Sequence, residues 1–465
     1  MKEIKTDILI IGAGPGGYVA AIYAAKQGKN VYLVDKRWIG GACLNEGCIP
    51  TKALVKSAEL YQEMINSEKN GISADNVRLN LETIINHKNE VKDKLVLGIE
   101  FLLKKYGVNI IMGEAAFKND TEVIVKGDEE YLISATDIII ATGAKTKHLP
   151  IEGIDLENVF DSEKILNNTK LPKSMTIIGG GIIGMEFAFI YANMGVKVNV
   201  VEFLPRILPT VEKDIALRLV RFAKQLNIDI YTGSSVKRVE KAKELLKVTF
   251  LRKDIEETLE SEFVLEAVGR APNMNNLGLD NTKIKYDSRL GIQVDQRMKT
   301  NIEHIYAIGD VNGKMQLAHV ASHQALVAVD NILGKDSSMH YNAIPSVIFT
   351  SPQIASVGMN EEMLKEQNIE YDLVKTPYSA NGKALILESE TGFIKILRNK
   401  ETNELLGASI FGKEAENLIS SYTLWISNKL TSGDIAHTIF AHPTIQELVH
   451  ESALGLEKKA IHFVD

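Results

Sequence analysis

The 465-residue sequence predicts an α/β protein with two βαβ units of one design and a C-terminal α+β region. Three observations predict it. A strand, a glycine-rich turn, a helix and a second strand follow one another near the N-terminus. The same pattern recurs in the middle of the chain, and it is absent from about Pro345 onward. At this length two to four domains are expected, because single cores rarely grow so large.

Composition excludes several classes of protein. The net charge of −7 argues against a nucleic-acid binder. Two cysteines do not make the framework of a secreted disulfide-rich protein, so a reducing compartment is favoured. The apolar run from Ile8 to Ile11 is too short for a signal peptide, and no uncharged run reaches bilayer length. We therefore expect a cytoplasmic protein.

The first βαβ unit carries a dinucleotide fingerprint. A strand is expected over Thr6–Ile11, a helix over Tyr18–Lys26 and a second strand over Val31–Val34. Between the first strand and the helix stand the glycines of a G-x-G-x-x-G motif, which are Gly12, Gly14 and Gly17, and Asp35 closes the second strand. The glycines let the backbone approach a pyrophosphate, and the acid binds ribose hydroxyls. This context predicts a Rossmann-like dinucleotide site.

The two cysteines of the chain, Cys43 and Cys48, lie in one window from Gly40 to Lys52. Glycines and Pro50 allow the backbone to bend there. A helical pattern, Ala53–Ile65, follows at once, so Cys48 is expected near a helix N-terminus, where the dipole stabilises a thiolate. The window predicts a redox-active pair; the alternative is two buried free thiols.

A long helix is expected over Leu81–Tyr106, ended by Gly107. Its periodic apolar residues predict a buried face made of Ile84, Ile85, Val91, Leu95, Ile99, Leu102 and Leu103. Three short strands then follow, over Glu122–Val125, Tyr131–Ser134 and Asp137–Ala141.

The second βαβ unit repeats the first. Strand Met175–Ile178 leads to Gly179, Gly181 and Gly184, then to a helix through Glu186, strand Val196–Val201 and Glu202. Gly184 stands 167 positions after Gly17, and Glu202 stands 167 positions after Asp35. The chain therefore holds two dinucleotide sites of one design. In one oxidoreductase, two such sites indicate a flavin and a nicotinamide.

Glu202 also indicates which nicotinamide is bound. Its carboxylate suits a ribose 2′-hydroxyl and would repel a 2′-phosphate. NADP sites usually offer arginines just past this strand, whereas here Phe203, Leu204 and Pro205 precede Arg206. NAD is therefore favoured.

The region after the second unit holds further strands and a pair of histidines. Strands are expected over Val264–Val268, which runs into Gly269, and over Ile305–Ile308, which ends in Asp310. After Met315–His319 a helix is expected that extends to Leu333. His319 and His323 have an i, i+4 spacing, but Val320 stands where a zincin needs Glu, so we expect no metal.

The C-terminal region is expected to alternate strands and helices without a nucleotide motif. Near its end stand His442, Pro443, Thr444 and Glu447. Thr444 and Glu447 have the spacing of a capping box, which is the structural interpretation. A thiol pair, however, needs a base that titrates near neutrality, and imidazole suits that task. His442 is therefore a candidate catalytic base.

Taken together, these motifs resemble the class I pyridine nucleotide–disulfide oxidoreductases over essentially the full length, and most closely the branch that acts on lipoamide. The matching segments are Gly12 to Gly17, Cys43 to Lys52, Ala141 to Gly143, Gly179 to Glu202, Ala307 to Asp310, and His442 to Glu447. The resemblance implies an FAD domain (1–147), an NAD domain inserted in it (148–272), a central continuation of the FAD domain (273–344) and a C-terminal α+β dimerisation domain (345–465).

The resemblance also implies the cofactor contacts. FAD would be bound by Gly12, Gly14, Gly17, Asp35, Lys52, Ala115, Thr142, Gly143, Asp310 and Ala318. NAD would be bound by Gly179, Gly181, Gly184, Glu186, Glu202, Val236 and Gly269. Lys52 would lie near the flavin N5 and pair with Glu186.

The chemistry that the resemblance implies is oxidation of protein-bound dihydrolipoamide by a homodimer, with NAD⁺ as acceptor. Cys43 would be the thiol that meets the substrate, and Cys48 the one nearer the flavin. His442 of the partner subunit, held by Glu447, would act as base. The partner protein would be the lipoylated component of a 2-oxo acid dehydrogenase complex or of the glycine cleavage system. Since the sequence starts at the first fingerprint strand, we expect no lipoyl domain ahead of it.

Three residues depart from the family pattern. Ala42 replaces Thr, Glu46 replaces Val, and Asp35 stands where Glu is more common. A carboxylate between the cysteines disfavours a nearby thiolate unless it points to solvent, so Glu46 is expected to modulate the redox pair.

Two other functions remain possible. The alternative enzyme is an NAD(P)H-dependent reductase of another small disulfide, similar to glutathione reductase. A mercuric reductase is disfavoured because the C-terminus has no cysteine pair. A purely structural subunit of a multienzyme complex would not need Cys43, Cys48 and His442 together.

Overall fold

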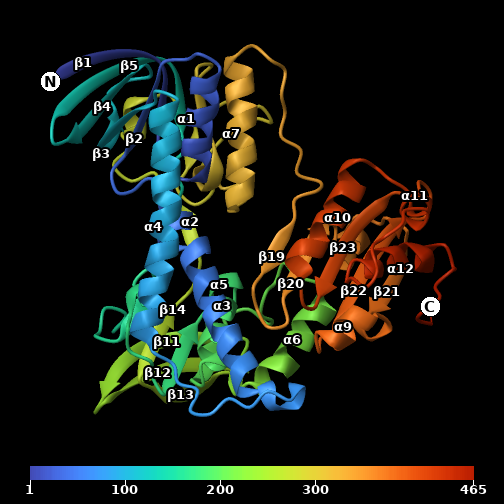
Figure 1. The fold of residues 1–465 in the computed structure, drawn as a ribbon. Helices are drawn as coiled ribbons and strands as arrows, with labels where there is room; N and C mark the ends of the chain where they lie inside the picture. The colour runs from blue at the N-terminus through green and yellow to red at the C-terminus, as the bar shows by residue number, and fades with distance from the viewer. Residues whose placement is uncertain (465) are drawn as a thin grey trace. The chain divides into compact units, whose positions relative to one another are not determined.

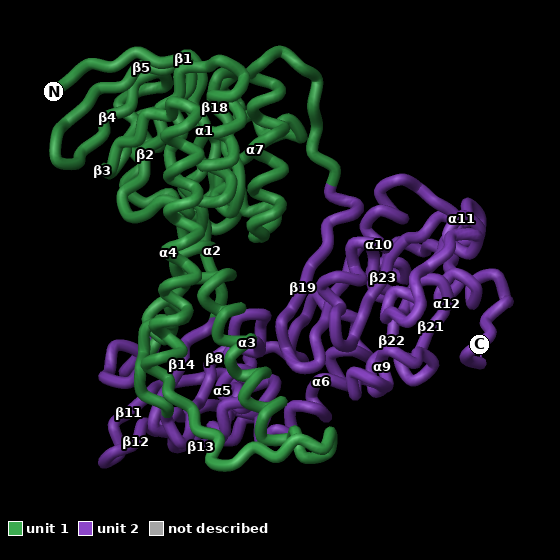
Figure 2. Tube along the Cα trace, in the orientation of Figure 1, with its two compact units in different colours: residues 1–150, 160–171, 268–340 green, residues 151–159, 172–267, 341–465 purple. Residues whose placement is uncertain are grey.

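The computed structural model describes residues 1–464, which fold as two compact units (Figures 1 and 2). The first unit comprises residues 1–150, 160–171 and 268–340; the second comprises 151–159, 172–267 and the described residues from 341 onward. The expected division into four domains is finer than these two units and stays a prediction. Within the described residues, no helix has the length and apolar character needed to cross a bilayer.

A six-stranded sheet forms the centre of the first unit. Its parallel strands are β1 (Lys2–Ile11), β2 (Val31–Asp35), β5 (Glu130–Ile140) and β18 (Ile305–Ala307), and β3 (Asn109–Phe117) joins β2 in parallel. β4 (Glu122–Gly127) pairs antiparallel with β3 and β5. β5 is one continuous strand where the sequence predicted two. The inner strands are continuous apolar runs, as expected where helices cover a parallel sheet.

Helices that pack in pairs complete the first unit. α1 (Pro15–Lys26) packs beside α7 (Ala318–Ile332), and α3 (Cys48–Ile65) packs on α4 (Leu81–Lys105) (Figure 1). A short helix, α2 (Gly41–Glu46), precedes α3, and a two-stranded ribbon joins β6 (Ala144–Thr146) to β15 (Arg270–Pro272). α2 and α3 span the whole cysteine window.

The predicted buried face of α4 is partly wrong. Ile85 and Leu103 are buried, but Leu95 and Leu102 are 43% and 38% exposed in this chain. Lys88 is buried instead, since its Nζ donates to the carbonyl of Leu166 at 2.8 Å and to Asn167 Oδ1 at 3.0 Å. Periodicity alone did not indicate that α4 buries a satisfied lysine against residues 165–167.

The second unit begins with the repeated βαβ pattern. Its parallel sheet has the order β10 (Ile228–Tyr231), β9 (Lys197–Val201), β8 (Ser174–Ile178), β14 (Phe263–Glu266) and β7 (Val159–Asp161). α5 (Ile182–Asn193) and α6 (Lys213–Gln225) are the helices that follow β8 and β9. An antiparallel sheet of β11 (Ser234–Ala242), β12 (Leu245–Arg252) and β13 (Ile255–Ser261) accompanies it.

The C-terminal part of the second unit is α+β, as the sequence predicts. Its antiparallel sheet has the order β19 (Ser346–Ile348), β20 (Ile354–Gly358), β23 (Leu405–Phe411), β22 (Phe393–Asn399) and β21 (Tyr371–Pro377). The helices are α8 (Glu361–Glu366), α9 (Gly382–Ile386), α10 (Ala415–Ser427), α11 (Ser432–Ala436) and α12 (Glu447–Leu456). The apolar faces of β20, β22 and β23 form one core with α10 and α12, which includes Tyr422 and Trp425.

Candidate active site

The first fingerprint makes a turn that only glycine fits. Gly12 has φ of +108°, and its amide donates to the carbonyl of Val34 at 2.7 Å. A Cβ on Gly17 would collide with the carbonyl oxygen of Gly12. α1 therefore begins close against the end of β1, with Pro15 in its first turn. The turn leaves backbone amides at the helix N-terminus, where a pyrophosphate is bound in such folds.

The acid at the end of β2 is held by the same turn. Asp35 Oδ2 accepts a hydrogen bond from the amide of Ala13 at 2.7 Å. Its Oδ1 accepts from the amide of Arg37 at 2.8 Å. The Asp side chain therefore reaches the fingerprint turn, and its role in ribose binding stays a prediction.

The second unit reproduces this geometry atom by atom. Gly179 has φ of +112°, and a Cβ on Gly184 would collide with the carbonyl oxygen of Gly179. Glu202 accepts from the amide of Gly180 at 2.5 Å and from that of Leu204 at 2.6 Å. The offset of 167 residues thus holds for hydrogen bonds as well as for sequence. Both glycine turns leave the space that a dinucleotide backbone needs, so these residues fit the two cofactors.

Arg206 is engaged elsewhere in the second unit. Its guanidinium forms a bidentate ion pair with Glu362 at 2.8 and 2.5 Å, and it also donates to the carbonyl of Pro209. An arginine held in this way does not offer a free partner for a 2′-phosphate. The structure therefore agrees with the preference for NAD that Glu202 indicates.

The remaining flavin-site candidates all lie in the first unit. Ala115 lies in β3 and is buried, and Ala318 is the first residue of α7. Thr142 donates from Oγ1 to the carbonyl of Asn273 at 2.7 Å, and Gly143 has φ of +69°. Partial burial raises the pKa of the Asp310 carboxyl, while Arg270 opposes this effect.

The remaining NAD-site candidates are divided between the units. Glu186 is buried in α5, where its Oε1 accepts from the amide of Phe349 at 3.0 Å. Val236 lies in β11. Gly269 has φ of +101° and belongs to the first unit. Because Lys52 and Glu186 lie in different units, their expected pairing stays a prediction.

The cysteine window folds directly onto the first fingerprint. Gly40, with φ of +92°, donates its amide to the carbonyl of Ala13 at 2.9 Å. A Cβ on Gly41 would press on the Cα of Gly14. Asn45 closes the turn from the other side, since its amide donates to the carbonyls of Ile39 at 3.0 Å and Gly41 at 2.9 Å. The glycines therefore set α2 against the predicted flavin site.

The structure brings the two thiols within hydrogen-bonding reach of each other. Cys43 is half-buried in α2, and Cys48 is exposed as the first residue of α3. A hydrogen bond with Cys48, together with burial, raises the pKa of the Cys43 thiol far above its usual range, and the nearby Lys52 opposes this. The position of Cys48 at a helix N-terminus is as the sequence predicts, whereas its disulfide with Cys43 stays a prediction.

Glu46, the last residue of α2, does not point to solvent. Its side chain is only 14% exposed, and Arg37 donates from Nη2 to its Oε1 at 3.0 Å. Glu163 and Arg270 face it from elsewhere in the first unit. Glu163 and Arg270 could not be predicted from the sequence as neighbours of Glu46, because no motif links the three distant segments that hold these residues.

His442 and Glu447 meet in the second unit. The Nδ1 of His442 lies 2.9 Å from Glu447 Oε1, and the imidazole side chain is 81% exposed. Burial alone would raise the pKa of the Glu447 carboxyl, but hydrogen bonds from the Thr444 amide and His442 bring it below its usual value. An ionised carboxylate therefore orients an accessible imidazole.

The capping interpretation of this segment is only half right. Glu447 Oε2 accepts from the Thr444 amide at 2.9 Å, but the Thr444 hydroxyl donates back to the carbonyl of Ala441 at 2.8 Å. α12 begins after Gln446 with no side-chain cap. Glu447 therefore holds both the turn and the imidazole.

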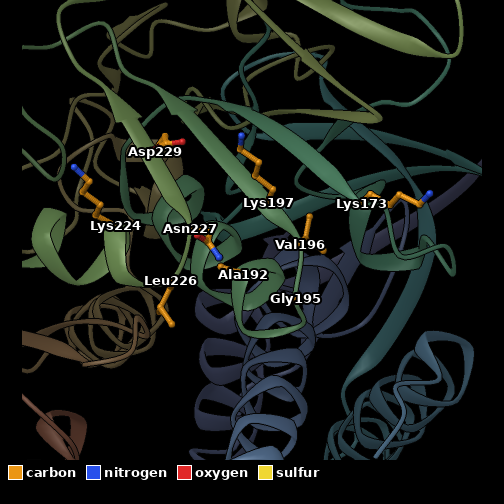
Figure 3. Close-up of a pocket in the computed structure, with 9 residues that line it drawn as sticks. All are labelled: Lys173, Ala192, Gly195, Val196, Lys197, Lys224, Leu226, Asn227 and Asp229. Atoms are coloured by element: carbon orange, nitrogen blue, oxygen red, sulfur yellow. The ribbon is translucent and has the colours of Figure 1, made fainter.

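A hollow of about 460 Å³ in the second unit lies away from the fingerprint (Figure 3). Lys173, Lys197 and Asn227 line it, at the points where β8, β9 and β10 begin. Ligands of such sheets bind at the opposite, carboxyl ends of the strands, so this hollow is not the dinucleotide site.

Among residues 1–464, no group of three or more His, Cys, Asp or Glu side chains is arranged to hold a metal ion.

Comparison with known proteins places the chain in a family. Residues 6–325 match the pyridine nucleotide-disulphide oxidoreductase family, and residues 344–453 match the dimerisation domain of that family. The chain therefore belongs to the pyridine nucleotide-disulphide oxidoreductases, whose members of this type use FAD and NAD.

Curated relatives and solved structures are similar over nearly the whole chain. Dihydrolipoyl dehydrogenases of Geobacillus stearothermophilus and Bacillus subtilis are each 40% identical, covering 99% of this chain and 98% of their own length. The crystal structure of LpdA from Mycobacterium tuberculosis has a TM-score of 0.91 at 26% identity, covering 97% of this chain and 99% of that one. The structure of the HOCl-induced flavoprotein disulfide reductase RclA of Escherichia coli has a TM-score of 0.86 at 29% identity. The match covers 96% of this chain and 99% of that one.

Proposed function

We propose that this chain is a dihydrolipoyl dehydrogenase, which oxidises protein-bound dihydrolipoamide through Cys43 and Cys48 and reduces NAD⁺. The observation that carries the proposal is the packing of the cysteine turn on the first dinucleotide fingerprint, through Gly41 and Gly14. The 40% identity with dihydrolipoyl dehydrogenases over 99% of the chain supports the choice of substrate.

In the proposed reaction His442 of the partner subunit removes a proton from one thiol of dihydrolipoamide. Glu447 fixes the imidazole through Nδ1, which leaves Nε2 to take that proton. The resulting thiolate attacks Cys43 Sγ, the bond between the two cysteine sulfurs breaks, and Cys48 leaves as a thiolate. The second substrate thiol then loses its proton to solvent and its sulfur displaces Cys43, which takes up the proton held by His442. The products are lipoamide, the Cys43 thiol and the Cys48 thiolate.

The reduced pair must be reoxidised before another turnover. Bound FAD supplies a two-electron carrier for this purpose, and NAD⁺ supplies the final hydride acceptor. The protein contributes binding through the two glycine turns, and Cys48 is held at the N-terminus of α3, where the helix dipole favours its thiolate.

The proposed partners follow from this chemistry. The match of residues 344–453 to the family's dimerisation domain supports a homodimer. An imidazole that is 81% exposed is suited to act on a site outside its own chain. The partner protein would be the lipoylated component of a 2-oxo acid dehydrogenase complex or of the glycine cleavage system.

Steady-state kinetics with the purified FAD-loaded protein test the proposal. We expect dihydrolipoamide to drive NADH formation, with NAD⁺ strongly preferred to NADP⁺. Cys43→Ser and Cys48→Ser should each abolish this turnover and retain the flavin. Loss of flavin in both variants would instead make the pair structural.

A second candidate is an NAD(P)H-dependent disulfide reductase, which the similarity to the flavoprotein disulfide reductase RclA favours. It predicts the opposite result, in which glutathione disulfide or another small disulfide is reduced while dihydrolipoamide is inert. The same protein preparation, assayed in both directions, separates the two functions.

A further inference from the structure

Two carboxyl groups meet beside the cysteine turn in an arrangement that requires a proton. Glu46 Oε1 accepts from Arg37, but its Oε2 is buried without a hydrogen-bond donor among residues 1–464. The carboxyl of Glu163 lies within hydrogen-bonding reach of Glu46. Ionised carboxylates only accept hydrogen bonds, so two of them cannot satisfy each other. One proton on Glu46 turns this contact into an O–H···O bond.

The surrounding charges favour placing that proton on Glu46. Glu163 Oε1 accepts from Arg270 at 3.3 Å and from Thr146 Oγ1 at 3.1 Å, and its Oε2 lies 3.7 Å from Arg37. Glu163 thus forms ion pairs with two guanidinium groups, whereas Glu46 forms one, with Arg37. Arg270 also faces Asp310. With Glu46 protonated, the positive charges of Arg37 and Arg270 are balanced by the negative charges of two carboxylates. These belong to Glu163 and Asp310.

The titration of the pair agrees with this geometry. Burial and then the contact with Glu163 raise the pKa of Glu46 to about 7, although Arg37 and Arg270 oppose the shift. For Glu163, burial alone would raise the pKa, but the hydrogen bond with Glu46 and the charge of Arg270 bring it below its usual value. Below about pH 7, therefore, the proton belongs to Glu46 and the charge to Glu163.

We propose that Glu46 is a positioning residue of the redox pair, which holds a proton against Glu163 and thereby keeps the α2 turn that bears Cys43 free of added negative charge. The inference rests on the proposed redox role of the cysteines. Cys43 and Glu46 are three residues apart on α2, a spacing that brings Cβ atoms to about 5–6 Å in a helix. When the proton leaves, the new charge disfavours the Cys43 thiolate.

The pH dependence of Cys43 alkylation tests this proposal directly. The FAD-loaded protein is reduced with a phosphine, treated with iodoacetamide, and the Cys43 peptide is quantified by mass spectrometry. We expect Glu46→Gln, which mimics the protonated carboxyl, to match the wild type well below pH 7. Well above pH 7, Glu46→Gln should react about 3 to 10 times faster, as expected for one like charge at this range. Glu46→Val should give the same ratio, which guards against a poorly folded Gln variant.

Glu163→Gln provides the opposite perturbation. Without the neighbouring carboxylate, Glu46 ionises at a lower pH, so Cys43 should react more slowly than in the wild type below pH 7 and similarly above it. Glu129→Gln, which removes an ion-paired carboxylate elsewhere in the first unit, serves as the control and should keep the wild-type profile. A Glu46→Gln profile that follows the wild type at every pH would overturn the proposal.

Thermal unfolding gives an independent readout. A carboxyl whose pKa is raised by folding stabilises the folded state most below its unfolded pKa, and this contribution is lost as pH rises toward 7. The melting temperature of Glu46→Gln relative to the wild type should therefore increase from pH 5 to pH 8. Because neither readout uses dihydrolipoamide, a failure here is distinct from a failure of the proposed substrate.

Discussion

At the scale of single residues, one acid is held by each of the two fingerprint turns. Asp35 and Glu202 each accept hydrogen bonds from the fingerprint turn and from the residue two positions further on. Both roles could be predicted from the sequence, because each acid follows its last glycine by the same 18 residues. The engagement of Arg206 by Glu362 could not, since these residues are 156 positions apart.

His442 carries the clearest prediction at this scale. Replacing it by Gln removes the proton acceptor and should lower dihydrolipoamide turnover by roughly 10²–10⁴-fold, as for a lost general base. His437→Gln is the matched control, because this exposed histidine of the same region lies with its Nδ1 2.7 Å from the carbonyl oxygen of Gly433. Normal turnover in His442→Gln would remove it from the mechanism.

Mixed dimers decide which subunit's cysteines His442 serves. Neither Cys43→Ser nor His442→Gln should be active alone. If the base acts across the dimer, a Cys43→Ser/His442→Gln heterodimer regains one complete site and should recover about half of the wild-type activity per dimer. No recovery in a verified heterodimer would assign His442 to the cysteines of its own chain.

At the scale of elements, the sequence predicted best where local chemistry decides the structure. The glycines of both fingerprints and the place of Cys48 near a helix N-terminus follow from backbone sterics and helix-end effects, which depend on neighbours in the chain. The helix itself begins at Cys48, earlier than the predicted Ala53. The buried face of α4 was predicted less well, because Lys88 is satisfied by residues 166 and 167. The Glu46–Glu163 pair depends on the same distant segment.

Substitutions of Gly184 and Gly181, the third and second glycines of the NAD fingerprint, should have different effects. The first should lower stability, and the second should weaken NAD⁺ binding. Gly184→Ala forces a Cβ into the carbonyl of Gly179, so the melting temperature should fall, in line with about 1–3 kcal/mol for overpacking. Gly181→Ala meets no protein atom within 4 Å and should leave stability unchanged, yet raise the KM for NAD⁺ because its methyl group occupies the dinucleotide path. Thermal melts and NAD⁺ titrations measure both, and the reverse pattern would contradict these assignments.

At the scale of the whole molecule, each unit is built from segments that are not contiguous in the sequence. Residues 160–171 return to the first unit between two segments of the second. This return supplies Glu163 to the cysteine turn, so the site environment depends on a topology that local patterns do not reveal. The motifs predicted the order in which the two dinucleotide units and the cysteine turn follow along the chain. They did not predict which charged side chains surround the cysteine turn, because these come from distant segments.

The central claim is that electrons pass from dihydrolipoamide through the cysteine pair to NAD⁺. An anaerobic spectral titration of the FAD-loaded protein with dihydrolipoamide, followed by NAD⁺, tests it most directly. We predict a long-wavelength absorbance band that appears with dihydrolipoamide, disappears on addition of NAD⁺, and is absent from Cys43→Ser treated in the same way. A flavin that is not reduced by dihydrolipoamide but is reduced by NADH or NADPH would contradict this electron path. The protein would then be assigned as a reductase of another disulfide.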